Sequence, residues 1–245
     1  HDPAWRDCTD DRLLAAAFSA ELDRLAAARY GRVLSLPLIV QIESARQRLA
    51  HAAQVQAATR AEGWVIERVE WPFPQEALAL AGLTVRGTID RIERHATTGA
   101  WRVLDYKTGE TALKPADAHL RPVRFNDPPE HPVPEMRLER HPRPQVWTDL
   151  QLPLYRWALR HTLQLTDVTL GYFNLPKAVG ETAITLWEDY DLDLHDAAVG
   201  CATSVAAAIA ADRFWPPTED VRYDDFASLF HEGVAESVEW EESRG

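Results

Sequence analysis

The sequence predicts an α/β domain, because stretches with helical periodicity alternate with short β-patterned runs. Alanine-rich amphipathic spacing predicts two long helices, over 9–29 and 38–62, ahead of a first strand at 64–70. With 245 residues and 46% apolar content, the chain can bury one sizeable core. The later predicted elements are a hairpin in 87–109, a helix beginning within 149–152, strands at 168–174 and 182–187, and helices over 192–212 and 223–230.

Residues 87–109 read GTIDRIERHATTGAWRVLDYKTG, two β-patterned runs joined by a Thr-Thr-Gly turn. Side chains along a strand alternate between its two faces, so Asp105 and Lys107 point the same way while Tyr106 points the other way. Asp90 lies in the first run and must join them across the hairpin. The turn therefore decides whether the three charged side chains meet.

Different loops give different partners for Asp90. A two-residue loop at Thr97-Thr98 places Asp90 opposite Asp105, and a loop moved by one residue toward Gly99 places it opposite Lys107. In both registers the three charged side chains share a face. A three-residue loop would set Asp90 opposite a residue of the other face, and a bulge would then be needed to bring the cluster together.

These residue types suit a divalent metal and phosphodiester hydrolysis. Two carboxylates and the backbone carbonyl of Tyr106 are the oxygen ligands that Mg²⁺ or Mn²⁺ prefers. The metal lowers the pKa of a bound water, and a neighbouring lysine can orient that water or stabilise charge on phosphorus. A solvated charge pair is the ordinary alternative for Asp-x-Lys. Asp90 and Asp105 both follow apolar strand residues, where an uncompensated charge is costly, and this favours the metal site.

A helix carrying Gln151 and Tyr155 is predicted after the hairpin. Apolar and aromatic positions recur at three- and four-residue steps, at Trp147, Leu150, Leu154, Trp157, Ala158 and His161. Pro153 is tolerated only near a first turn, so the helix should begin just before it, capped by Thr148 or Asp149. Gln151 and Tyr155 are four residues apart and lie on the same side of such a helix. Taken alone, Tyr155 is equally consistent with an amphipathic core residue.

Three motifs together resemble the RecB-type branch of the PD-(D/E)XK nuclease superfamily. They are Gly-x-x-Asp-Arg-Ile from Gly87, Val-Leu-Asp-Tyr-Lys-Thr-Gly from Val103, and Gln-x-x-x-Tyr from Gln151. The matched region is 43–230, with the motifs in its middle. The resemblance implies a restriction-endonuclease-like core of order αβββαβ, a central mixed β-sheet flanked by α-helices. It further implies a metal-dependent DNA nuclease, an exonuclease on single strands or DNA ends in repair and recombination.

The resemblance also assigns roles to single residues. The implied catalytic residues are Asp90, Asp105, Lys107, Gln151 and Tyr155. The implied metal ligands are Asp90, Asp105 and the backbone carbonyl of Tyr106. The implied DNA contacts are Arg91, Gln151 and Tyr155.

Two further metal ligands and a basic flap are weaker expectations. Glu70 matches a position where the family often has a glutamate, and is equally consistent with an exposed strand residue. His1 matches an N-terminal histidine of RecB-like nucleases, and is equally consistent with an unrelated terminal residue. The proline-rich stretch 110–145 lacks periodicity, which is typical of a mobile cationic flap or a disordered insertion. The basic residues expected near DNA are Arg121, Arg124 and Arg140.

We expect a single domain over 1–245. It divides into a helical N-terminal part at 1–62, a catalytic core at 64–187 that includes the loop 110–145, and an acidic helical C-terminal part at 190–245. The chain opens without methionine, which fits a domain excised from a longer helicase-nuclease chain. The resemblance implies a helicase module or subunit as partner, beside the DNA itself.

No other cofactor and no membrane are expected. Cys8 and Cys201 are too few for the four-cysteine iron-sulfur cluster of several RecB-like nucleases, and sparse cysteine suits the cytoplasm. The chain has no P-loop motif, so nucleotide hydrolysis is not expected. No apolar run by eye approaches the roughly 18 residues of a membrane helix.

The net charge of −12 is concentrated in one part of the chain. Residues 181–245 carry 16 acidic and 3 basic residues, while the remainder carries 22 acidic and 23 basic residues. A local electropositive groove is therefore compatible with DNA binding, whereas attraction through the whole surface is not. The acidic part is interpreted as a solvated helix face, with docking on a basic partner as the alternative.

Other functional classes stay open at this point. A catalytically silent DNA-binding or scaffolding subunit of a helicase-nuclease complex would be expected to lose Asp90, Asp105 or Lys107, and all three are present. A sequence-specific endonuclease would be expected to dimerise on duplex DNA. A protein-interaction module without enzymatic activity would use the acidic C-terminal part.

Overall fold

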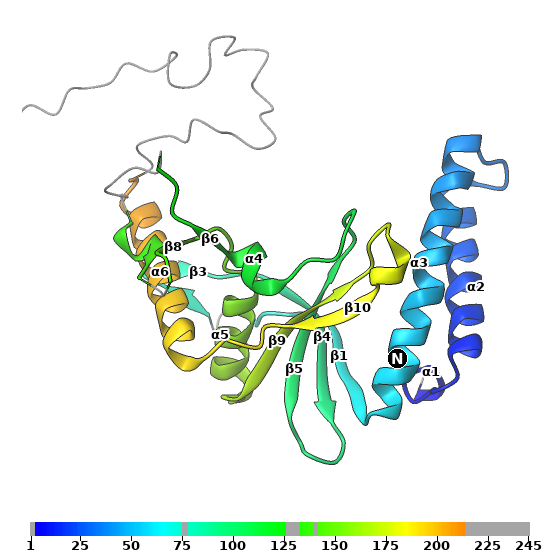
Figure 1. Ribbon diagram of the computed structural model, residues 1–245, viewed down its shortest axis with the longest axis horizontal. Coiled ribbons are helices and arrows are strands. Elements are labelled where there is room, and N and C mark those ends of the chain that lie inside the picture. The colour runs from blue at the N-terminus through cyan, green and yellow to red at the C-terminus, as the bar shows by residue number, and fades with distance from the viewer. Residues whose placement is uncertain (1–2, 75–77, 126–132, 140–141, 214–245) are drawn as a thin grey trace, which may run out of the picture.

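The computed structural model describes residues 3–74, 78–125, 133–139 and 142–213. Its centre is a five-stranded sheet in the order β1-β4-β5-β9-β10, with helices on both sides (Figure 1). The strands are β1 (Trp64–Pro72), β4 (Thr88–His95), β5 (Trp101–Lys107), β9 (Val168–Asn174) and β10 (Ala183–Leu186). β5 and β9 run parallel and the other neighbours antiparallel, so the sheet is mixed. The predicted α/β fold of the restriction-endonuclease type is confirmed.

The hairpin β4-β5 has the register that places the two aspartates opposite each other. Arg91 pairs with Leu104 and Arg94 with Trp101, and continuing this register by one step pairs Asp90 with Asp105. The loop is wider than the expected two residues, because it spans 96–99 and closes with a hydrogen bond from the amide of Gly99 to the carbonyl of His95, at 2.9 Å. Gly99 has φ 74°, which glycine adopts without steric cost. The loop gains one residue on each side of Thr97-Thr98, so the strand register is the one expected for a two-residue loop at that position.

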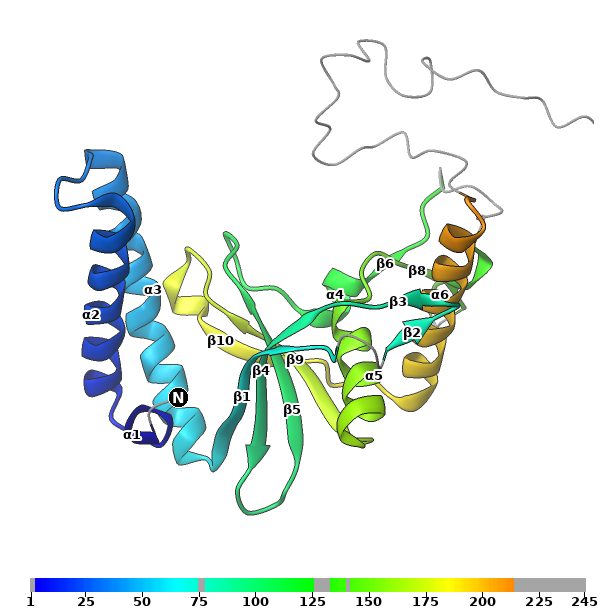
Figure 2. The same cartoon turned by 180° about the vertical axis from the view of Figure 1, so that it is seen from behind.

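The helices lie close to their predicted positions. They are α2 (Asp11–Tyr30), α3 (Leu36–Ala61), α5 (Gln151–Leu163) and α6 (Leu192–Ala210), with a short α1 (Pro3–Arg6) before them. Helix α3 covers one face of the sheet and α5 the other, while α2 packs along α3 and α6 along α5 (Figure 2). The main core lies on the α5 side and includes Ile92, Val103, Leu170 and Leu152. The sheet therefore presents one face to each helical layer.

The proline-rich stretch after β5 is more ordered than expected. It contains α4 (Pro115–His119), β6 (Leu120–Pro122), the 3-10 turn η1 (Pro134–Met136), β7 (Arg137–Leu138) and β8 (Gln145–Trp147). The three strands form a small antiparallel sheet in the order β6-β8-β7. Elements this short leave no periodic pattern in the sequence, which is why the stretch read as an irregular loop. A second small pair, β2 (Ala79–Leu80) with β3 (Leu83–Thr84), precedes β4.

Helix α6 is the one helix among the described residues with the length and composition to cross a membrane, at 19 residues and a mean hydropathy of 1.2. This corrects the expectation that no run approaches that length. Its residues Leu194, Ala198, Cys201 and Ala202 lie in the main core, so packing occupies its apolar face. The helix predicted over 223–230 lies outside the described residues.

Candidate active site

Four side chains from β5 and α5 close a ring of polar contacts. The Lys107 ammonium lies 2.7 Å from Asp105 Oδ2 and donates to Gln151 Oε1 at 3.0 Å. Gln151 Nε2 donates to the Tyr155 hydroxyl at 2.9 Å, and this hydroxyl donates to Asp105 Oδ1 at 3.3 Å. Every donor meets an acceptor around the ring, which fixes the orientation of the Gln151 amide, because its oxygen must face the ammonium. The structure thus brings together residues from all three sequence motifs once Asp90 is added.

Asp90 stands beside this ring on the neighbouring strand. Its Oδ2 accepts the backbone amide of Tyr106 at 2.9 Å, at the point where regular pairing between β4 and β5 has ended. No residue in the described part of the chain forms a hydrogen bond or ion pair with its other carboxylate oxygen. That oxygen is therefore available to a ligand.

The carboxylates at the site carry more negative charge than Lys107 neutralises. The Asp105 side chain is only 4% exposed, and burial raises the pKa of its carboxyl; Lys107 opposes this rise, and the negative charge of Asp90 adds to it. Two carboxylates and one ammonium leave a net charge of −1. The donor set fits a hard divalent cation held by two carboxylate oxygens with water or carbonyl oxygens in addition. Among the described residues no group of three His, Cys, Asp or Glu converges.

The start of α5 fixes where Gln151 stands. The amide of Gln151 donates to Asp149 Oδ1 at 2.6 Å, and the amide of Leu152 donates to His119 Nε2 at 3.2 Å. Pro153 has no amide hydrogen, and Leu154 already donates to the carbonyl of Leu150 at 2.9 Å. Of the four amides that a helix start leaves unpaired, those of Gln151 and Leu152 therefore have acceptors and that of Pro153 is absent. The expected start before Pro153 is confirmed, but the N-cap residue is Leu150 and not Asp149 or Thr148; Asp149 accepts the Gln151 amide from the position before the cap.

The glycine of the Gly-x-x-Asp motif has a steric reason. A Cβ on Gly87 would lie 2.9 Å from the ring of Phe73, closer than real side chains allow. Phe73 in turn packs edge-on against Tyr155, with 6.2 Å between ring centroids. The absence of a side chain at Gly87 therefore allows Phe73 to pack against Tyr155, a member of the ring of polar contacts.

Tyr172 was missed by sequence reasoning and lies directly beneath the site. It is fully buried on β9, opposite Asp105 in the parallel register, and the Lys107 ammonium lies 4.8 Å from its ring centroid. An ammonium over a tyrosine face is an attractive contact. Only the β5-β9 register could have indicated it, because in the sequence Tyr172 is an ordinary strand residue.

Arg91 lies on the opposite face of the sheet, where it cannot reach DNA. It is 2% exposed and forms an ion pair with Glu93, hydrogen-bonds Gln56 of α3 at 2.6 Å, and contacts the Tyr106 hydroxyl at 3.3 Å. Glu93, itself 0% exposed, also pairs with Arg102 at 2.5 Å. This placement contradicts the expectation that Arg91 contacts DNA. The physical reason is strand alternation, since Asp90 faces α5 and its neighbour must face α3.

The weaker candidates are scattered. Glu70 is exposed in β1, level with Asp90 between two paired positions, and has φ 46°, a strained conformation for a non-glycine residue. Arg121 lies partly buried in β6, and Arg124 is exposed just after it. His1 and Arg140 lie outside the described residues.

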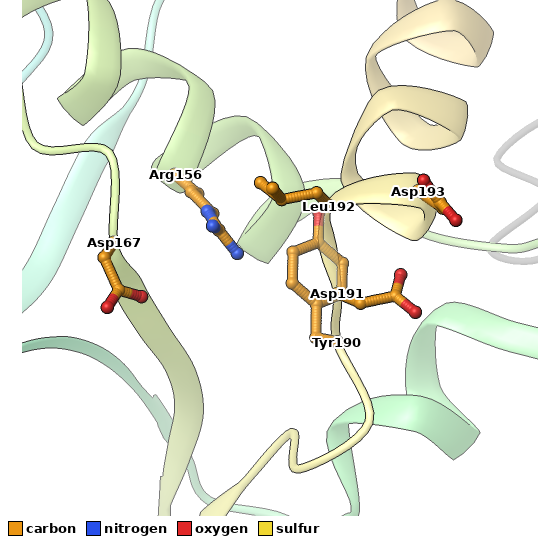
Figure 3. Close-up of a pocket in the computed structure, with 6 residues that line it drawn as sticks. All are labelled: Arg156, Asp167, Tyr190, Asp191, Leu192 and Asp193. Atoms are coloured by element: carbon orange, nitrogen blue, oxygen red, sulfur yellow. The ribbon is translucent and has the colours of Figure 1, made fainter.

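A cavity of about 450 Å³ lies away from the carboxylates. Arg156, Asp167 and Tyr190 line it together with the first residues of α6, as Figure 3 shows. Asp167 precedes β9, so this cavity is at the start of the parallel strands, whereas Asp105 and Lys107 are at the end of β5. Because the reactive groups and not a cavity determine where the chemistry takes place, we place the candidate site at Asp105.

Comparison with known proteins agrees with this geometry. The family model of the PD-(D/E)XK nuclease superfamily matches residues 3–222. No curated protein matches the chain. The matched span includes the whole five-stranded sheet, both flanking helices and each of the five converging side chains. The chain belongs to the PD-(D/E)XK nuclease superfamily.

Proposed function

We propose that this chain is a metal-dependent nuclease that hydrolyses phosphodiester bonds of DNA at the Asp90, Asp105 and Lys107 cluster. The observation that carries the proposal is the closed ring of Asp105, Lys107, Gln151 and Tyr155 with Asp90 beside it. Superfamily membership supports a nuclease, and the ring supplies residues suited to the reaction. The metal is Mg²⁺ or Mn²⁺, because both acidic groups are carboxylates.

Each side chain has a distinct part in this proposal. Asp90 and Asp105 would hold the cation, and the Tyr106 carbonyl would be the third protein oxygen. A bound divalent cation supplies an acidified water and screens the phosphate charge. Lys107 donates hydrogen bonds toward the attacking water or the phosphate oxygens. Gln151 directs the ammonium through its amide oxygen, and Tyr155 holds the second oxygen of Asp105.

Glu70 is proposed as an additional ligand, directly or through water. It stands level with Asp90 on the adjacent strand, and its carboxylate has no partner in the described part of the chain. Its positive φ interrupts the regular strand at that position. Backbone strain of this kind occurs preferentially at functional sites, which supports a role there.

The finer substrate class rests on the sequence motifs alone. The Gln-x-x-x-Tyr element and its companions resemble the RecB-type branch, so we propose action on single strands or DNA ends, with a helicase as partner in repair. Arg121 and Arg124 are proposed backbone contacts from the folded insertion. A catalytically silent scaffold is the competing function, although no observation on the described residues favours it.

Cleavage of end-labelled DNA tests the activity. The purified chain should degrade single-stranded DNA or duplex ends with Mg²⁺ or Mn²⁺ and lose activity in EDTA. Lys107→Ala should reduce the rate on the order of 10³-fold, because it removes a charged donor from the reacting centre. Lys177→Ala is the matched control, since this exposed lysine pairs only with Glu110 on the surface. Equal cleavage by both variants would reject the site, and no cleavage by the parent would support the scaffold.

A further inference from the structure

We propose that His119 is a positioning residue that fixes the Lys107 ammonium from two sides at once. The inference rests on the proposed function for its consequence on rate, while its geometry stands independently. His119 ends the short helix α4 in the insertion after β5, and its side chain is fully buried, at 0% exposure. It belongs neither to the sequence motifs nor to the polar ring. A buried histidine whose nitrogens are all engaged is a strong orienting element.

Both ring nitrogens of His119 make contacts. Nε2 accepts the amide of Leu152 at 3.2 Å, while Nδ1 lies 2.9 Å from the carbonyl of Pro115 and 3.1 Å from the Tyr172 hydroxyl. A backbone amide can only donate, so Nε2 must be the unprotonated nitrogen. The proton therefore sits on Nδ1, where it is shared between the Pro115 carbonyl and the Tyr172 oxygen. The contacts select one tautomer of the neutral imidazole.

The neutral state agrees with the surroundings of the ring. Burial lowers the pKa of His119, and the positive charge of Lys107 lowers it further, whereas Asp149 at 4.0 Å and the Pro115 carbonyl raise it. A second proton on Nε2 would face the amide of Leu152, placing two donors against each other. The ring also stacks near Trp187, with 4.9 Å between centroids, so it has little room to turn.

The first route from His119 to Lys107 runs through α5. By accepting the Leu152 amide, His119 holds the first turn of the helix, and Gln151 is the residue directly before Leu152. Gln151 Oε1 accepts from the Lys107 ammonium at 3.0 Å. A shift of the helix start would therefore move the acceptor that directs the lysine.

The second route runs through Tyr172. The Tyr172 hydroxyl contacts His119 Nδ1, and the face of the same ring lies 4.8 Å from the Lys107 ammonium. Three groups surround this ammonium, namely Asp105, Gln151 and the Tyr172 ring. His119 holds two of the three, so it acts on the lysine without touching it. A residue that acts in this way affects rate more than substrate affinity.

Nitrogen NMR tests the geometry without any cleavage assay. Long-range ¹H-¹⁵N correlations in uniformly labelled protein distinguish the two neutral tautomers of a histidine, and loss of signals in His119→Asn assigns the ring. We expect the Nδ1-H tautomer, with a coupling across the hydrogen bond from the Leu152 amide to Nε2. An Nε2-H tautomer, or a ring that titrates like an exposed histidine, would overturn the proposal.

Two matched variants test the consequence. His119→Asn keeps a donor near the Nδ1 position and loses the acceptor for Leu152, whereas His119→Gln places an acceptor near the Nε2 position and loses the Nδ1 donor. We expect His119→Asn to lower kcat about 10- to 100-fold with little change in KM, and His119→Gln to recover part of this loss. The Lys107 side-chain resonance should also shift in His119→Asn. The chain has only three lysines, so this resonance can be assigned by substituting each lysine in turn.

Tyr172→Phe is a third variant that tests the same proposal if either His119 variant fails to fold. It removes the hydroxyl near Nδ1 and retains the ring beneath Lys107, so it should shift the His119 signals and lower kcat less than His119→Asn. Unchanged Lys107 resonances in all three variants would overturn the positioning role. If the parent protein did not cleave DNA, only the proposed function would be rejected. The Lys107 resonances would still test whether His119 positions the lysine.

Discussion

The two faces of the β4-β5 hairpin both bury charged residues, yet they do so in different ways. On the α3 face, Glu93 lies between Arg91 and Arg102, and all three are at most 4% exposed. On the α5 face, Asp105 is equally buried, but Lys107 is a quarter exposed and one oxygen of Asp90 has no partner within the described ranges. Both oxygens of the buried carboxylate are therefore paired in the first cluster, whereas the second retains a carboxylate oxygen open to a ligand.

The difference shows how neighbouring residues on one strand can have separate purposes. On the α3 face each carboxylate oxygen of Glu93 has a guanidinium partner, and Gln56 and the Tyr106 hydroxyl complete the contacts of Arg91. The two arginines leave this cluster with a net positive charge, and Nη2 of Arg102 has no hydrogen-bond partner among the described residues. Charges on the α5 face leave a net negative site that a cation would complete. Burial of a carboxylate alone therefore does not mark an active site, and a carboxylate oxygen that no cationic side chain occupies marks it better.

Asp105→Asn should have the largest effect on activity and little effect on folding. Loss of a metal-binding carboxylate is expected to lower the cleavage rate on the order of 10³-fold. Burial raises the pKa of Asp105 above its unfolded value, so protonation stabilises the fold at low pH and this contribution is lost as pH rises through the folded pKa. At neutral pH the asparagine variant should therefore be as stable as the parent or slightly more so in urea unfolding.

Metal addition supplies the control for this substitution. Mg²⁺ or Mn²⁺ should raise the unfolding midpoint of the parent, because a ligand that binds only the folded state stabilises it. The midpoint of Asp105→Asn should rise much less. An equal rise in both proteins would mean that the cation binds elsewhere.

Glu93→Gln should have the opposite profile, with a large effect on stability. Removing the carboxylate that lies between the buried Arg91 and Arg102 guanidinium groups leaves both without their ion-pair partner, and we expect a loss of about 3–5 kcal/mol in the free energy of unfolding. Urea titration measures this loss. Activity per folded molecule should stay near that of the parent, because the cluster faces α3; a selective loss of activity in a stable variant would break the distinction between the two faces.

Tyr155→Phe should have the smallest effect. It removes the hydroxyl that bridges Gln151 and Asp105 while retaining the ring against Phe73. The contact to Asp105 is long, at 3.3 Å, so we expect only about a tenfold loss of rate, equal to about 1.4 kcal/mol. Single-turnover cleavage would show it. A loss as large as that of Asp105→Asn would assign the hydroxyl a direct role at the reacting atoms.

The sequence predicted most of the frame because its patterns are local. The strand at 168–174 and the helix start before Pro153 agree with the structure, since strand alternation and proline geometry act within a few residues. The sequence did not decide between the hairpin registers, because the register depends on the turn. In the structure the turn is wider than two residues and extends equally on both strands. The wrong prediction that Arg91 contacts DNA could have been avoided. The alternation of side chains along a strand, which places Asp105 and Lys107 on one face, also places Arg91 on the face opposite to Asp90.

The insertion and its contacts could not be predicted in the same way. Helix α4 and strands β6, β7 and β8 are too short to leave a periodic signal among many prolines. His119 reaches Leu152 across 33 residues and Tyr172 across 53, so neither contact has a local trace in the sequence. Long-range partners of this kind became visible only when the strands had been placed.

The pairing of the amides of Gln151 and Leu152 at the start of α5 bears on the order in which ligands bind at the site. Helix starts commonly attract phosphate through free amides, but here an aspartate and a histidine accept the amides of Gln151 and Leu152, and the next residue is a proline without an amide hydrogen. An incoming DNA phosphate would meet a net charge of −1 with only one ammonium to attract it. We therefore expect ordered assembly, in which the cation arrives first and the nucleic acid second. The availability of metal would then control the affinity of this site for DNA, as well as its rate of cleavage.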